Sequence, residues 1–416
     1  MGLAVVVGTA PVEAQVAPIS AAVKGTSAET GVADDNRVGR VHDAMERSVI
    51  GESPEQWLQA EHSCYLARKA GVLKDTGFHY AMDVSLLQQW GLNGGGSPSL
   101  QVLLTPSFNW DLFSNPTWGS GSLQFAYNAS LTYPTRQDAV DIQSRLGLVT
   151  AINDMSSRQL QFVQLSYTHT SPGKVVSMGI GQYPFDKFDG NEYLANQQRN
   201  FNNAILVQDG ATTYPVAGLG AFVQWNVTDT VQVATGFQGA NNLSGQTLSA
   251  RRWGSDGLAW FGYLQWTPKV AGMGTAQYSA SWFSTPAVPA QEASQVWSIN
   301  AVQNVSEDWA VFARANRAIG HATSIRGSWA LGAARNNPLG RNSSDQIAIA
   351  IGRSEVAAPP ANSAGARNET IVETYWNWAL PGALVLSPSA QLVLDPAFDR
   401  SRDHAWILGL RATMLF

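Results

Sequence analysis

Several segments of the sequence place charged and aromatic residues at every second position, between apolar ones. If these segments are strands, alternate residues face the same side, and one side then collects carboxylates, guanidinium groups and aromatic rings. Such a surface suits a sugar, whose ring has apolar C–H faces and a rim of hydroxyls. The candidate substrate-contacting residues are Asp83, Asp141, Arg145, Phe222, Tyr263, Phe312, Arg314, Arg326, Glu373, Tyr375 and Arg411.

The charges in this set have both signs, with arginine slightly in excess. A strongly charge-selective pore would instead carry a ring of one sign. A simpler interpretation is that the aromatic rings fill volume and the charges keep a channel wet. The residues alone therefore leave four functions open: a sugar-selective channel, a general diffusion channel, a barrel that exports a polysaccharide, and a structural or adhesin barrel whose lumen is filled.

Covalent catalysis is not indicated by the sequence. The six histidines are scattered, and no Gly-x-Ser-x-Gly motif places a nucleophile. The acidic residues around Asp186–Glu192 include an Asp-Gly pair, which is more typical of a turn than of a calcium site. We expect neither an enzyme nor a bound metal or cofactor.

The segment His404–Phe416 shows the strand pattern most clearly. Trp406, Leu408, Leu410 and Met414 alternate with a mixed set that includes Arg411. Lipid on one side and a polar lumen on the other produce this alternation in transmembrane β-barrels. The same alternation recurs in many segments from Gly77 onward, which makes a chance pattern implausible.

The composition agrees with a membrane barrel. Only 14% of the 416 residues are charged, against about a quarter in soluble domains. No apolar run approaches the roughly 20 residues of a spanning helix. A net charge of −5 argues against a nucleic-acid partner.

We therefore predict an all-β transmembrane antiparallel barrel over residues 77–416. Counting segments gives 17 or 18 strands, and because single-chain barrels close with an even number, 16 or 18 is expected. One of the predicted strands covers 140–148. Residues 1–14 resemble a truncated signal peptide, and 15–76 are expected to form a periplasmic or plug segment with a short helix. The stretches expected to form extracellular loops are 184–203, 239–256, 284–293, 334–343 and 354–368.

Several short stretches resemble the carbohydrate-selective porins of the OprB family. They are Gly181–Phe185, Tyr214-Pro215, Gly218–Ala221, Val231–Gly236, Glu369–Asn377 and Ala405–Ala412. The resemblance spans about Gly77–Phe416 and contains no catalytic motif. It implies a 16-stranded barrel that admits sugars by facilitated diffusion, with arginines and acidic residues near its constriction.

The expected location is the outer membrane of a Gram-negative bacterium. The expected partners are sugars or small polyols, together with the lipid and lipopolysaccharide of that membrane. A homotrimer is one candidate assembly.

Overall fold

The computed structural model describes residues 76–415, with short gaps at 134–135, 155–159, 189–190, 243–244, 246–247, 249, 251–252, 290, 321, 343, 358–367 and 382. The signal peptide and the short helix expected before residue 76 lie outside the described residues. Every statement below concerns the described part of the chain.

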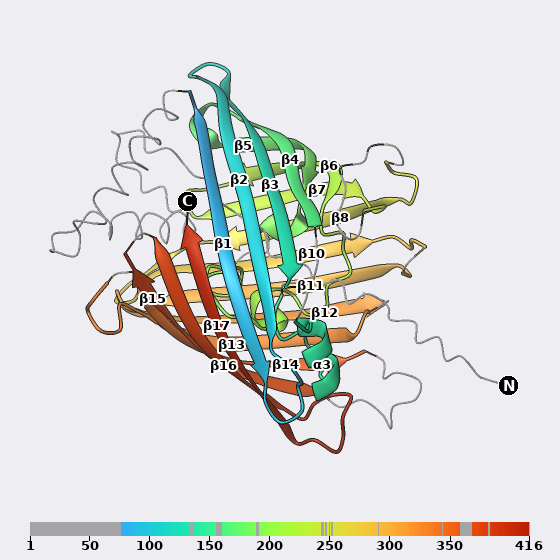
Figure 1. Cartoon of the computed structure of the whole chain (residues 1–416). Coiled ribbons are helices and arrows are strands. Elements are labelled where there is room, and N and C mark those ends of the chain that lie inside the picture. The colour runs from blue at the N-terminus through green and yellow to red at the C-terminus, as the bar shows by residue number, and fades with distance from the viewer. Residues whose placement is uncertain are drawn as a thin grey trace.

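The described chain consists mainly of strands (Figure 1). The first eight are β1 (Phe78–Gly91), β2 (Ser99–Asn115), β3 (Gly119–Thr132), β4 (Leu160–Thr170), β5 (Val176–Tyr183), β6 (Gly218–Asn226), β7 (Val231–Gly239) and β8 (Leu258–Trp266). The others are β9 (Lys269–Val270), β10 (Gly274–Thr285), β11 (Ser294–Asn304), β12 (Trp309–Gly320), β13 (Ile325–Asn336), β14 (Gln346–Val356), β15 (Glu369–Leu380), β16 (Leu384–Leu394) and β17 (His404–Leu415).

These strands close into an antiparallel barrel. Each wall strand pairs with its neighbours in chain order, and β1 pairs with β17 from Asp83–Leu415 to Gly91–Ile407. The wall has 16 strands, because the two-residue β9 pairs with β10 beside the end of β8 and belongs to the turn between them. Closure leaves no strand edge whose N–H and C=O groups would lack partners in lipid. The lower of the two expected strand numbers is therefore the observed one.

The outer face of the wall is apolar and the inner face is mixed, as the alternation predicts. On β17, Trp406, Leu408 and Leu410 are exposed on the outside, whereas Arg411 is fully buried inside. Exposed outer tryptophans lie towards both ends of the strands, at Trp225, Trp266, Trp309 and Trp378 near one end and Trp260, Trp297, Trp329 and Trp406 near the other. Two aromatic girdles around an apolar band are typical of outer-membrane barrels.

The two ends of the barrel differ in the length of their connections. One end, the short-turn end, carries connections such as 116–118, 227–230 and 305–308, and the other, the long-loop end, carries 133–159, 184–217 and 240–257. The prediction of an extracellular loop at 334–343 is wrong, because β13 continues to Asn336 and its connection to β14 lies at the short-turn end.

The predicted strand at 140–148 is also wrong, because its core is helix α3 (Ala139–Leu146). Ala139, Ile142 and Leu146 are buried at helical spacing, Asp138 caps the first turn, and Gly147 ends the helix with a φ of 71°. Alternating apolar residues concealed this helical pattern. Among the described helices, none is both long enough and apolar enough to cross a membrane.

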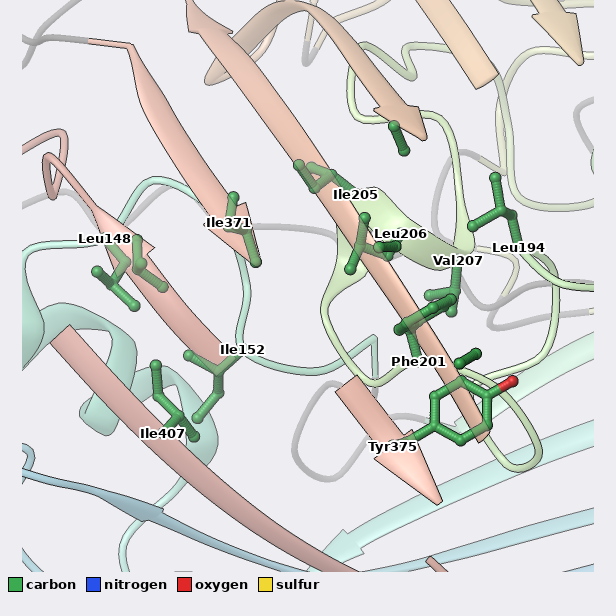
Figure 2. Packing of buried hydrophobic residues seen from close by; sticks show 14 of the residues in the cluster. Leu148, Ile152, Leu194, Phe201, Ile205, Leu206, Val207, Ile371, Tyr375 and Ile407 are labelled. Atoms are coloured by element: carbon green, nitrogen blue, oxygen red, sulfur yellow. The ribbon is translucent and has the colours of Figure 1, made fainter. Parts of the chain in front are cut away.

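The connection between β5 and β6, residues 184–217, folds into the barrel, and we call it the inner loop. It contains η2 (Phe185–Phe188) and the short helix α4 (Ala204–Val207). Figure 2 shows Phe201, Ile205 and Leu206 of this loop packed with Ile371 and Tyr375 of β15. Small residues on β14 make room for it: a Cβ at Gly352 would come within 2.9 Å of the Ile205 Cδ1. Residues 184–203 therefore begin at the long-loop end, as expected for a loop, but line the interior.

Candidate pore lining and constriction

The first part of the inner loop forms an aromatic cluster with strands β6, β8 and β10. The Phe188 ring stacks on Phe261 at 4.5 Å between centroids and meets Phe222 edge-on at 5.3 Å. The Phe185 ring lies 5.9 Å from Phe283. The predicted contact residues Phe222 and Tyr263 both belong to this cluster and are at least nine-tenths buried. Both rings contact Phe188 of the loop, with centroids 5.3 Å away for Phe222 and 6.0 Å away for Tyr263.

The middle of the inner loop is held by two fully buried charged residues of the wall. Glu373 of β15 accepts hydrogen bonds from the backbone N–H groups of Asn202 at 2.8 Å and Asn203 at 2.9 Å. Arg411 of β17 donates to the backbone carbonyls of Asn200, at 2.9 Å, and Gln197. Main-chain donors and acceptors of one loop segment are thus matched to a carboxylate and a guanidinium.

A second charged contact fixes the loop to β1, the strand that pairs with β17 where the barrel closes. The Arg199 guanidinium donates to both carboxylate oxygens of Asp83 on β1, with Nη2 2.9 Å from Oδ2. The neighbouring Gln198 accepts from the Thr105 hydroxyl at 2.8 Å and donates to Ser85 at 3.0 Å. Unlike Glu373 and Arg411, the Asp83 and Arg199 side chains retain 12% and 15% exposure, so this ion pair reaches the lumen.

Strand β12 contributes an aromatic and a charged anchor. The Phe312 ring stacks on Tyr193 of the inner loop at 5.2 Å, and burial raises the pKa of the Tyr193 phenol well above its usual range. Arg314 donates to Asn300 at 2.8 Å and lies 3.8 Å from the carboxylate of Asp209, near the end of the loop. The predicted residue Tyr375 packs edge-on against Phe201 at 4.8 Å.

The connection between β3 and β4, residues 133–159, joins the inner loop, and we call it the α3 loop. Buried Glu369 of β15 accepts from the backbone N–H groups of Val149 at 3.0 Å and Thr150 at 3.1 Å. The Ala204 N–H donates to the Ala151 carbonyl at 3.1 Å, and the Asp154 N–H donates to Asn202. The two loops therefore form one inner layer across this side of the barrel.

Three predicted contact residues lie elsewhere. Asp141 and Arg145 sit on the exposed face of α3, so they do not line the lumen from a strand as expected. Arg326 is half-buried at a register shift between Ile325 and Gly327 of β13. This bulge inserts an extra residue, and the neighbouring Ile325 packs into the interior cluster.

Sequence alternation missed the charged residues that the inner loop itself carries. Lys187, Glu192 and Arg199 are all partly exposed within the barrel. The Lys187 ammonium lies 4.9 Å from the centre of the Phe222 ring, and burial lowers the pKa of Lys187 to about 8. A polar loop of more than 30 residues between two strands was the available signal, since loops of that length are usually functional.

The wall strands divide into two halves. Eight consecutive strands, β3–β8, β10 and β11, contain no Asp, Glu, Lys or Arg, and we call them the charge-free wall. We call β12–β17, β1 and β2 the charged wall. The inward charges of the charged wall are Asp83, Asp111, Arg314, Glu369, Glu373 and Arg411.

The charge-free wall presents amides and hydroxyls to the interior. Near the short-turn end, the partly exposed inward residues of this wall include Gln124, Gln224, Gln232, Gln265 and Gln277. Such a surface can exchange hydrogen bonds with a neutral polar solute without attracting either sign of ion.

Comparisons with known proteins agree with this geometry. A family model described as "Carbohydrate-selective porin, OprB family" matches residues 114–416. Porin AaxA of Chlamydia felis is 32% identical over 349 residues, which cover 82% of this chain and 78% of that protein. Porin AaxA of Chlamydia pneumoniae is 32% identical over 355 residues, covering 82% and 80%. A high-pH structure of Pseudomonas putida OprB matches with a TM-score of 0.69 at 15% identity, covering 84% of this chain and 97% of that one, and this likeness concerns the fold.

Proposed function

Because the chain belongs to the carbohydrate-selective porin family, OprB, and is a bacterial outer-membrane porin, we propose that it passes neutral sugars and small polyols by passive diffusion. The observation that carries this proposal is the charge-free wall. Most inward charges of the strands are occupied in holding the inner loop and the α3 loop, whereas the opposite wall offers uncharged amides and hydroxyls. A neutral polyhydroxylated solute can bind there weakly and leave again.

The direct test is single-channel conductance in a planar bilayer, titrated with glucose and maltose. We expect a steady conductance that falls saturably as sugar is added, because a bound sugar obstructs ion flow. Liposome swelling should rank glucose above gluconate and glucosamine, which have similar size but opposite charges. Conductance indifferent to every sugar, with equal swelling rates, would instead identify a general diffusion porin.

The strands differ in length around the barrel, and this difference bears on how copies of the protein assemble in the membrane. Strands β5–β8 have 8 or 9 residues, whereas β10–β17 have 11 or 12. At about 3.3 Å per residue and a tilt near 40°, nine residues rise about 23 Å, less than the roughly 25 Å apolar band. A homotrimer that buries this low wall, with its exposed Met178 and Ile180, would relieve the mismatch.

Light scattering in mild detergent tests this assembly. We expect a protein mass of about three chains of 44.7 kDa, and Ile180→Arg should reduce it to one. The host membrane would be the outer membrane of a Gram-negative bacterium, with the long-loop end facing the lipopolysaccharide leaflet. A single-chain mass for the unaltered protein would contradict the homotrimer.

A further inference from the structure

Two glutamines face each other inside the charge-free wall near the short-turn end. Gln232 is the second residue of β7 and Gln265 the last but one of β8, and the two are register partners. Both side chains are partly exposed. Partner positions on neighbouring strands hold their Cβ atoms about 4.5–5.5 Å apart, so the two amide groups are neighbours within the lumen.

Hydrogen bonds within the wall orient both amides. The Gln232 Nε2 donates to the Asn226 Oδ1 at 2.9 Å. The Tyr263 hydroxyl donates to the Gln265 Oε1 at 2.7 Å. The first bond uses the Nε2 of Gln232 and leaves its carbonyl oxygen for a solute. The second uses the carbonyl oxygen of Gln265 and leaves its NH₂ group for a solute.

An adjacent acceptor and donor match the chemistry of a vicinal diol. One hydroxyl can donate to the Gln232 Oε1 while its neighbour accepts from the Gln265 Nε2. An ion gains little from such a pair, and a solute with isolated ether oxygens can only accept. Because two neutral hydrogen bonds in a wet site are worth little each, the solute would exchange rapidly, as passage requires.

We propose that Gln232 and Gln265 form a diol-binding site for sugars at the short-turn end of the channel, oriented by Asn226 and Tyr263. This site rests on the proposed passage of sugars and names where one binding step occurs. Tyr263 was expected from the sequence to contact sugar directly. In the proposed site, it is instead a positioning residue.

The test combines sugar block with matched variants. In a planar bilayer, the sorbitol concentration that halves the conductance should rise about tenfold in Gln232→Leu/Gln265→Leu, because two hydrogen bonds are lost. Tyr263→Phe keeps the ring but removes the hydroxyl, and it should raise this sorbitol concentration about threefold. Gln88→Leu makes the same change on the outer face, between Leu410 and Leu100, and should leave this sorbitol concentration unchanged. Tetraethylene glycol, which has no vicinal diol, should block the unaltered channel much less than sorbitol.

The outcomes distinguish a failure of the diol site from a failure of the proposed function. Sorbitol block that persists unchanged in the double variant would overturn the diol site and leave sugar passage standing. Equal block by sorbitol and tetraethylene glycol would overturn diol recognition. No block of the unaltered channel by any sugar would overturn both. Heat-modifiable migration on gels confirms that each variant has folded.

Discussion

The charged wall and the charge-free wall share an apolar outer band and differ in their interiors. Both present aliphatic side chains and tryptophans to the outside. Inside, the charged wall is covered by the inner loop and the α3 loop, and Glu369, Glu373 and Arg411 are fully buried against them. The charge-free wall meets the inner loop through the aromatic cluster and leaves its glutamines partly exposed.

This difference shows that charge inside a porin need not serve the solute. A buried carboxylate is stable only when donors surround it, and Glu373 meets backbone N–H groups instead of a permeating molecule. The inner loop adds charges of its own that are partly exposed within the barrel, namely Lys187, Glu192 and Arg199. The buried anchors Glu373 and Arg411 are therefore not among the side chains proposed to meet a solute.

The largest expected effect comes from breaking an anchor of the charged wall. Glu373→Ala removes the acceptor for two loop N–H groups and leaves Arg411 buried without that opposite charge. We expect a loss of about 3–5 kcal/mol in the free energy of unfolding, together with a larger and noisier conductance. Urea unfolding in detergent, followed by tryptophan fluorescence, measures the loss.

The matched control is Glu355→Ala on the outer face. Glu355 pairs with Arg317 at 2.7 Å, and both side chains are exposed, so a change below about 1 kcal/mol is expected. Similar losses in the two variants would contradict the anchoring role of Glu373.

The outer surfaces of the two walls should respond alike. Leu410→Arg on the charged wall and Ile299→Arg on the charge-free wall each place a cation near the middle of an exposed apolar strand face. Each should cost about 2–4 kcal/mol at the membrane midplane. Unfolding from lipid vesicles provides the measurement, and a neutral result at either position would contradict its lipid contact.

A new charge in the charge-free wall should change the ion selectivity of the channel. Gln224→Glu adds a carboxylate at a partly exposed inward position. A unit charge at about 7 Å in water favours a cation by roughly 0.6 kcal/mol and disfavours an anion by as much, so the cation-to-anion permeability ratio should rise about sevenfold at low salt. Reversal potentials in a KCl gradient report this ratio. Arg314→Gln, at a buried anchor, should change the ratio less, and the opposite order would contradict the division of roles.

The smallest expected effect is a pH dependence from Lys187. Burial lowers the pKa of Lys187 to about 8 from 10.5, so its ammonium is charged at pH 7 and mostly neutral at pH 9. Loss of this positive charge should raise the cation-to-anion permeability ratio by up to about twofold over that interval. The Lys187→Met channel should show no such change with pH. If that variant instead keeps the pH dependence of the unaltered channel, the titration belongs to another group.

The sequence predicted the wall better than it predicted the lumen. Period-two alternation reports which side a strand residue faces, and it placed Arg411, Glu373 and Tyr375 inside. It does not report what covers an inward residue, because that depends on a loop that is distant in sequence. Asn202 and Arg411, for example, are separated by 209 positions.

The failures also have local causes. Helix α3 satisfied a period-two pattern by coincidence, although its Asp138 cap and Gly147 end were visible in the sequence. The bulge beside Arg326 shifted the alternation by one residue. The absence of charge from β3–β8, β10 and β11 could be read directly from the sequence, whereas the pairing of Gln232 with Gln265 required the strand register.

The way in which the inner loop is held bears on how such a channel can evolve. Glu373 and Arg411 hold main-chain atoms of residues 197–203, so the anchors do not depend on the side chains at most of these positions. Substitutions at partly exposed loop positions, such as Lys187, can then alter what is admitted while the loop stays in place. A lineage could acquire a new nutrient preference through single substitutions, each retaining a folded channel.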